Sequence, residues 1–164
     1  MNVPTMVPKG SKSSMVVVCG SMSHFGSMCQ VRKELLEDEV PVALPDVEDE
    51  DVASLDEVHY RSFVGKAALN HLRRVRSPRT FAILVVNFDK EGIEDYIGPS
   101  TFAEIASAAS HSKRIFILNE FPTVYRDVLN AWKAVPLHGR LDSLVQLYRE
   151  ACKGWADTQL DLQV

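Results

Sequence analysis

Apolar residues occur along the chain in short uninterrupted runs, separated by stretches with a longer period. Runs of roughly four to eight residues, rich in β-branched side chains, are typical of strands buried on both faces, as inside a parallel sheet. The central run, FAILVVNF, is apolar except for Asn87. The runs predict strands over Met15–Cys19, Val40–Leu44, Phe81–Phe88 and Ile115–Leu118, and a clipped fifth strand at Val135–Leu137.

Between the runs, apolar side chains recur every three or four residues, which places them on one face of a helix. Phe102, Ile105, Ala106 and Ala109 share such a face in a helix that begins near Thr101. The other predicted helices are one with Met28, Val31 and Leu35 facing inward, and helices over Leu55–Val75, Tyr125–Ala134 and Leu141–Lys153.

The strict alternation of strand and helix predicts a doubly wound α/β domain, a flavodoxin-like parallel sheet with strand order 2-1-3-4-5 and helices on both faces. Pro41 favours an edge position for the second strand. We expect this single domain to span 15–154, after a disordered leader at 1–14 that is rich in Pro, Gly and Ser. The residues 155–164 form a tail without a clear pattern.

Charge and composition narrow the class of protein. The chain has 164 residues, a formal net charge of −4 and a pI near 5.7, which favours neither a nucleic-acid polymer nor a membrane surface as a partner. No apolar run reaches the roughly 20 residues that span a bilayer, and the first residues lack the apolar core of a signal peptide. We therefore expect a cytoplasmic protein.

The potential metal ligands are not arranged in a recognisable local motif. Cys19, Cys29 and Cys152 form no CxxC pair, so we expect reduced, mostly buried thiols. The acidic run from Asp46 to Asp51 lacks EF-hand spacing and is interpreted as a solvated loop. His59 and His71 have no second ligand at metal-binding spacing and are interpreted as surface or capping residues. The sequence thus predicts no metal site and no cofactor.

Two loops should meet at the carboxyl edge of the sheet. Ligands of open α/β sheets bind at the point where the strand order reverses, here between the first and third strands. The turn Gly20–Ser23 and the loop Asp89–Ser100 follow those strands. The turn could present backbone N–H groups to a phosphate, although it lacks the GxGxxG pattern, and Ser23 could also simply cap the following helix.

Glu104 is the candidate for chemistry at this edge. Thr101-Phe102-Ala103-Glu104 fits the capping-box pattern T-x-x-E, in which the Glu bonds back to the first residue of the helix. Alternatively, a carboxylate at a helix start beside a sugar could attack an anomeric carbon. The pattern alone leaves both readings open.

The segments CGSMSHF, LVVNFD and GPSTFAEIASAASHSKRIFIL together resemble the nucleoside 2-deoxyribosyltransferase superfamily, which includes 2′-deoxynucleoside 5′-monophosphate N-glycosidases. The resemblance covers roughly Met15 to Leu118. It implies that Glu104 is the catalytic nucleophile, that Gly20 and Ser21 hold the sugar or phosphate, and that Gly98 and Ser100 belong to the loop before the nucleophile. Ala106 stands where the family has glycine after E-I, Ser112-Lys113 stands for G-K, and the loop 90–98 is longer.

The expected activity is cleavage or transfer of the N-glycosidic bond of a (deoxy)nucleoside or its 5′-monophosphate, without a cofactor. Asp89 would orient sugar hydroxyls or handle a proton, or would simply be a polar residue at the start of the loop. Tyr96 would stack on the base or pack over the core. The further candidates for substrate binding are Ser23, His24 and Asn87. The alternatives are a nucleotide-binding module without chemistry, which would use Glu104 only as a cap, and cleavage of another ribosyl-nucleotide.

The same resemblance implies a homo-oligomer. Its contact surface would include apolar residues of the second helix and of the tail, namely Trp155, Leu160 and Leu162.

Overall fold

The protein folds into a five-stranded, all-parallel sheet with the order β2-β1-β3-β4-β5. The computed structural model describes residues 14–46 and 56–161, and their side chains as far as residue 154. The strands are β1 (Met15–Gly20), β2 (Val42–Ala43), β3 (Thr80–Val86), β4 (Arg114–Ile117) and β5 (Val135–Pro136). The predicted topology is therefore confirmed, including the edge position of β2.

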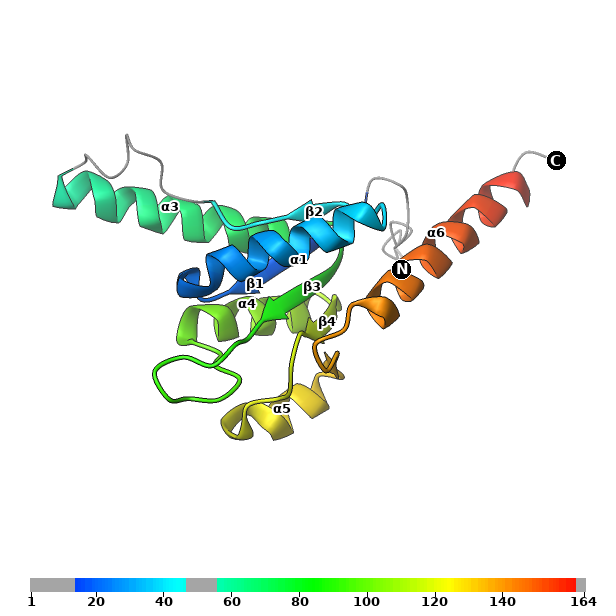
Figure 1. Ribbon diagram of the computed structural model, residues 1–164. Coiled ribbons are helices and arrows are strands. Elements are labelled where there is room, and N and C mark those ends of the chain that lie inside the picture. The colour runs from blue at the N-terminus through cyan, green and yellow to red at the C-terminus, as the bar shows by residue number, and fades with distance from the viewer. Residues whose placement is uncertain (1–13, 47–55, 162–164) are drawn as a thin grey trace, which may run out of the picture.

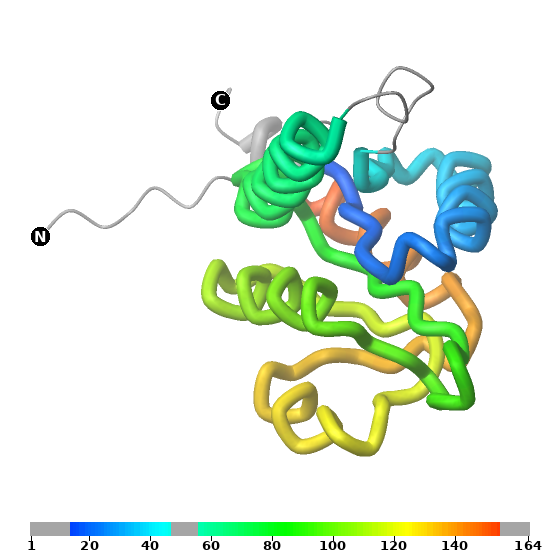
Figure 2. Tube along the Cα trace, turned by 90° about the vertical axis from the view of Figure 1, so that its left-hand side faces the viewer, coloured from blue at the N-terminus to red at the C-terminus, as the bar shows by residue number. Residues whose placement is uncertain are grey.

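Helices cover both faces of this sheet (Figures 1 and 2). They are α1 (Phe25–Glu37), α3 (Glu57–Arg76), α4 (Pro99–Ser110), α5 (Arg126–Ala131) and α6 (Asp142–Asp161), with short 3-10 turns at Met22–His24 and Thr123–Tyr125. Figure 2 shows α3 and α4 on one side of the strands and α1 on the other.

The core has two layers because alternate residues of each strand point to opposite faces. Val16 and Val18 of β1 pack with α1 and α6, whereas Val17 and Cys19 pack on the side of α3, α4 and α5. All seven residues of β3 are buried, as expected for the central strand of a doubly wound sheet.

Several boundaries differ from those predicted. Ser14, assigned to the leader, is buried, and its carbonyl accepts a hydrogen bond from the hydroxyl of Tyr148. The rest of that leader lies outside the described residues, as do 47–51 of the acidic run. The backbone of α6 continues through part of the predicted tail to Asp161. The side chains of Trp155, Leu160 and Leu162 are outside the described part, so the expected oligomer stays a prediction that light scattering tests.

Helix α3 has an unusual placement. Asp56 caps its start by accepting hydrogen bonds from the amides of Val58 and His59, and His71 and Val75 are its buried residues. Figure 1 shows that the first half of α3 extends beyond the carboxyl ends of the strands. That overhang forms one wall of the pocket described below. Among the described residues, no helix is both long and apolar enough to cross a membrane.

Candidate functional site

A cavity of about 590 Å³ opens at the carboxyl edge of the sheet, between the overhang of α3, the turn after β1 and the start of α4. The turn after β1 contributes Gly20 and Ser21, and the start of α4 contributes Gly98, Ser100 and Glu104. The loops after β1 and β3 therefore line one pocket at the point where the strand order reverses, which confirms their predicted convergence.

Two glycines allow the chain segments to approach closely here. A Cβ on Gly20 would lie 2.8 Å from the carbonyl oxygen of Val86 and 2.9 Å from the side chain of Met28. A Cβ on Gly98 would lie 2.8 Å from the hydroxyl of Tyr96. A side chain at Gly20 would clash with the backbone of β3, whereas a side chain at Gly98 would require the Tyr96 ring to shift.

The walls differ in character. Four large side chains, Phe25, Phe63, Val64 and Tyr96, supply apolar or aromatic surface. The polar side chains of the lining are Ser21, Asp46, His71, Ser100, Thr101 and Glu104, and Asp46 is paired with Arg74. A mostly apolar cavity with a few convergent polar groups is typical of a small-molecule site.

Glu104 does not form the predicted capping box. Gly98 is the N-cap of α4 and Pro99 is its first residue, so Thr101 is already inside the first turn and Glu104 lies in the second. The structural interpretation of T-x-x-E is therefore wrong. The reason is local: Pro at the first helical position is favoured, and it starts the helix two residues before Thr101.

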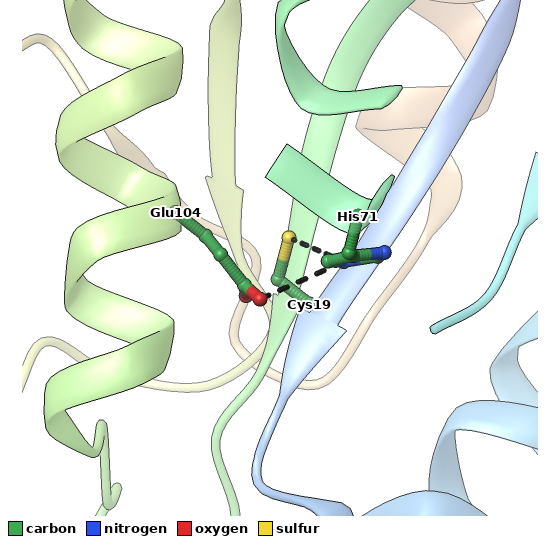
Figure 3. A group of neighbouring side chains, drawn as sticks. All are labelled: Cys19, His71 and Glu104. Atoms are coloured by element: carbon green, nitrogen blue, oxygen red, sulfur yellow. Dashed lines mark hydrogen bonds and ion pairs between the residues drawn. The ribbon is translucent and has the colours of Figure 1, made fainter. Parts of the chain in front are cut away.

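The Glu104 carboxylate instead meets two buried side chains (Figure 3). Its Oε1 atom lies 3.8 Å from Nε2 of His71, and the same Nε2 lies 3.6 Å from Sγ of Cys19. The three residues come from α4, α3 and β1. Glu104 retains 17% of its side-chain exposure, whereas His71 and Cys19 are buried.

Burial dominates the ionisation of this cluster. It raises the pKa of Glu104 to about 7 and, together with the charge of Arg74, lowers the pKa of His71 to about 4. Burial and the neighbouring Glu104 also raise the pKa of the Cys19 thiol well above its ordinary value. At neutral pH the imidazole and the thiol are uncharged, and both forms of Glu104 are populated. Perturbed groups in a cleft are a mark of functional sites.

The prediction that His71 is a surface or capping residue is wrong. Residues 63, 67, 71 and 75 follow one another at i, i+4 spacing along α3, and this stripe faces the pocket and the core. His71 is the polar member of the stripe, and that spacing could have identified it. Cys29, expected to be mostly buried, is exposed, while Cys19 is buried as expected and all three cysteines are free.

Four predicted site residues do not line the pocket. Asn87 is fully buried and holds loops together: its amide donates to the carbonyls of Asp95 and Glu120, and its oxygen accepts from the amide of Asn119. Asp89 is exposed and accepts from the backbone amide of Asp95, which fixes the loop.

The other two lie beside the turn after β1. Ser23 Oγ is 2.9 Å from Ser21 Oγ, and neither makes a side-chain cap, so the capping interpretation of Ser23 is wrong. His24 contacts the ring of Phe88 edge-on at 6.0 Å between ring centres.

Lys90 is a residue that sequence reasoning missed. Its ammonium donates to Ser21 Oγ at 3.2 Å and lies 5.1 Å from the ring centre of Tyr96. Two backbone hydrogen bonds pair Lys90 with Ile93 across a tight turn at Glu91-Gly92, whose φ angles are 51° and 79°. The long loop therefore places a cation beside two residues that line the pocket, a result of folding that no local pattern signals.

No protein-family model, curated protein or solved structure matches this chain. The resemblance to the nucleoside 2-deoxyribosyltransferase superfamily accordingly stays a prediction from the sequence.

Proposed function

We propose that the protein cleaves or transfers the N-glycosidic bond of a (deoxy)nucleoside or nucleoside 5′-monophosphate, with Glu104 as the nucleophile. The observation that carries this proposal is the position of Glu104. Its side chain, 17% exposed, lines a mostly apolar pocket at the sheet's switch point, and it has no capping role. Its Oε2 atom has no hydrogen-bond partner among the described residues.

In the proposed mechanism, the ionised Glu104 carboxylate attacks C1′ of the sugar. The C1′–N bond breaks as the C1′–O bond forms, and its electron pair leaves with the base, which takes a proton from water. A water molecule or a second base then attacks C1′, gives its proton to the hydroxide left by the first step, and releases the carboxylate. The apolar walls around Phe63 and Tyr96 would hold the base, and the turn at Gly20 and Ser21 would hold the sugar or phosphate.

The position of Lys90 favours a substrate that carries a phosphate group. Lys90 does not itself line the pocket, but its ammonium donates a hydrogen bond to Ser21, which does. Charge-assisted hydrogen bonds are worth about 1.5–3 kcal/mol, so Lys90→Ala should raise KM for a 5′-monophosphate by roughly tenfold or more. KM for the matching nucleoside should stay the same. Equal effects on both substrates would remove Lys90 from phosphate recognition.

Asp89 has no part in this proposal, because its carboxylate is engaged in the loop and does not line the pocket.

The alternative function is a nucleotide-binding module that uses the same pocket without chemistry. Incubating the full chain with a panel of nucleosides and 5′-monophosphates, followed by chromatography for free base, tests the proposal. Saturable binding of a monophosphate without base release would favour the binding module.

A further inference from the structure

Three side chains of the kinds that bind metal ions meet at the base of the pocket. Cys19 Sγ, His71 Nε2 and a carboxylate oxygen of Glu104 all lie within 4.8 Å of one another. Figure 3 shows the three side chains pointing toward one another from β1, α3 and α4. We propose that Cys19, His71 and Glu104 together bind a Zn²⁺ ion.

The spacing of the ligand atoms fits such an ion. Tetrahedral Zn²⁺ with ordinary bond lengths holds its sulfur, nitrogen and oxygen ligands roughly 3.3–3.6 Å apart. Here Sγ and Nε2 are 3.6 Å apart, and Nε2 and Oε1 are 3.8 Å apart. The imidazole–carboxylate distance is too long for a hydrogen bond. Sγ and the carboxylate oxygen lie within 4.8 Å of each other, so rotation of the side chains would bring all three atoms to the ion.

The cluster also contains buried polar atoms that the protein leaves unpartnered. Among the described residues, Glu104 Oε2 is buried and has no hydrogen-bond partner, and the same holds for His71 Nδ1, the ring nitrogen that is not the proposed ligand. Such atoms carry an energetic cost that is normally offset by a partner. A divalent cation would give the buried carboxylate its missing counter-charge.

The donor set selects the type of ion. Thiolate, imidazole and carboxylate are the three ligand types of protein zinc sites, whereas Mg²⁺ and Ca²⁺ prefer oxygen ligands alone. His71 would bind through Nε2, the ring nitrogen that faces both Cys19 Sγ and Glu104 Oε1. Cys19 must release its thiol proton to solvent as the ion binds, because the thiolate is the ligand.

The site would keep one position open. His71 and Glu104 both line the pocket, so an ion between them has an entry path, and a water molecule can complete its coordination. Three protein ligands and an open position are typical of non-structural zinc sites. A bound ion would occupy the Glu104 carboxylate, and Zn²⁺ should therefore suppress any base release that depends on it.

Cobalt spectroscopy tests the site without any nucleoside. In the full chain with Cys29→Ser and Cys152→Ser, Cys19 is the single cysteine. Titration with Co²⁺ should produce a thiolate-to-metal charge-transfer band that saturates at one ion per chain and disappears when Zn²⁺ is added. The absence of a saturable band, or a band with more than one ion per chain, would overturn the proposal.

Matched variants locate the ligands. When Cys19→Ser is added to this double variant, the charge-transfer band should disappear. Circular dichroism checks that the variant still folds. His71→Asn and Glu104→Gln keep the thiol and should weaken Co²⁺ binding by more than roughly tenfold, the least that loss of a supporting contact costs at metal sites. Unchanged affinity in both would overturn the assignment. This assay measures metal binding without any nucleoside. Metal binding can therefore be absent while base release is present, and base release can be absent while metal binding is present.

Discussion

Two polar clusters lie at the same edge of the sheet and are built in opposite ways. Behind β3 and β4, Asn87 uses both ends of its amide in three hydrogen bonds, and Asn119 Nδ2 returns one to the carbonyl of Asn87. Between β1 and β3, Glu104 and His71 each keep a buried atom without a partner among the described residues. The first cluster holds loops together through paired polar groups, whereas the second has the unpaired polar groups expected of a ligand-binding site.

This difference shows why a polar residue at a strand end is not by itself a site residue. Buried polar groups that stabilise the fold are normally hydrogen-bonded. A buried polar group without a hydrogen-bond partner lowers the free energy of unfolding unless a ligand binds it. Asn87 and Glu104 were both predicted as site residues, Glu104 through its motif and the family resemblance and Asn87 as a further candidate. Their hydrogen bonds, which only the folded structure provides, separate the two roles.

The largest expected effect comes from Glu104→Gln. The amide keeps the shape of the side chain but cannot act as a nucleophile, so base release should fall by at least roughly 10³-fold. The free energy of unfolding should change little, because Glu104 does not cap α4. Chromatography for free base and urea unfolding measure the two quantities. A variant that releases base at nearly the wild-type rate would eliminate the nucleophilic mechanism.

The next largest effect should be on stability. Asn87→Leu has a similar volume but leaves the amide of Asn119 and the carbonyls of Asp95 and Glu120 without their partner. We expect the free energy of unfolding to fall by about 2–4 kcal/mol. Asn130→Leu, at an exposed position on α5, is the control and should change it by less than about 0.5 kcal/mol. If the free energy of unfolding fell no further than in the control, the hydrogen bonds of Asn87 would not stabilise the fold.

The opposite result is expected for His71→Leu. Leucine fills a similar volume in the apolar surroundings of α3 and removes a buried nitrogen that has no partner among the described residues. The free energy of unfolding, measured in the presence of a chelator, should rise or change by less than about 1 kcal/mol. A loss above about 2 kcal/mol would show that His71 holds the fold together, and the contrast between the clusters would disappear.

The fold could be predicted because its signals are local. Each buried strand is a short apolar run, and the alternation with helices fixes the parallel topology. The pocket could be placed for the same reason, since the strand order alone locates the switch point between β1 and β3.

The chemistry inside the pocket could be predicted only in part. Glu104 was found through a motif. Cys19 and His71, which lie beside it in the folded protein, precede it by 85 and 33 positions in the sequence. Metal-ligand spacing rules apply to residues close in sequence, so they cannot detect ligands that three separate elements bring together. Lys90 is a similar case, because its role depends on where a long loop folds back.

The smallest effect is expected for Ser23→Ala. Ser23 is exposed, does not line the pocket and makes no capping hydrogen bond, and its hydroxyl contacts Ser21 Oγ. Loss of a true N-cap would cost about 0.5–2 kcal/mol, whereas here we expect a change in the free energy of unfolding below about 0.5 kcal/mol. Ser21→Ala is the matched comparison, since Ser21 lines the pocket and accepts from Lys90. It should raise KM for a 5′-monophosphate while Ser23→Ala does not. If Ser23→Ala raised KM as much as Ser21→Ala, the boundary of the site would have to include the whole turn after β1.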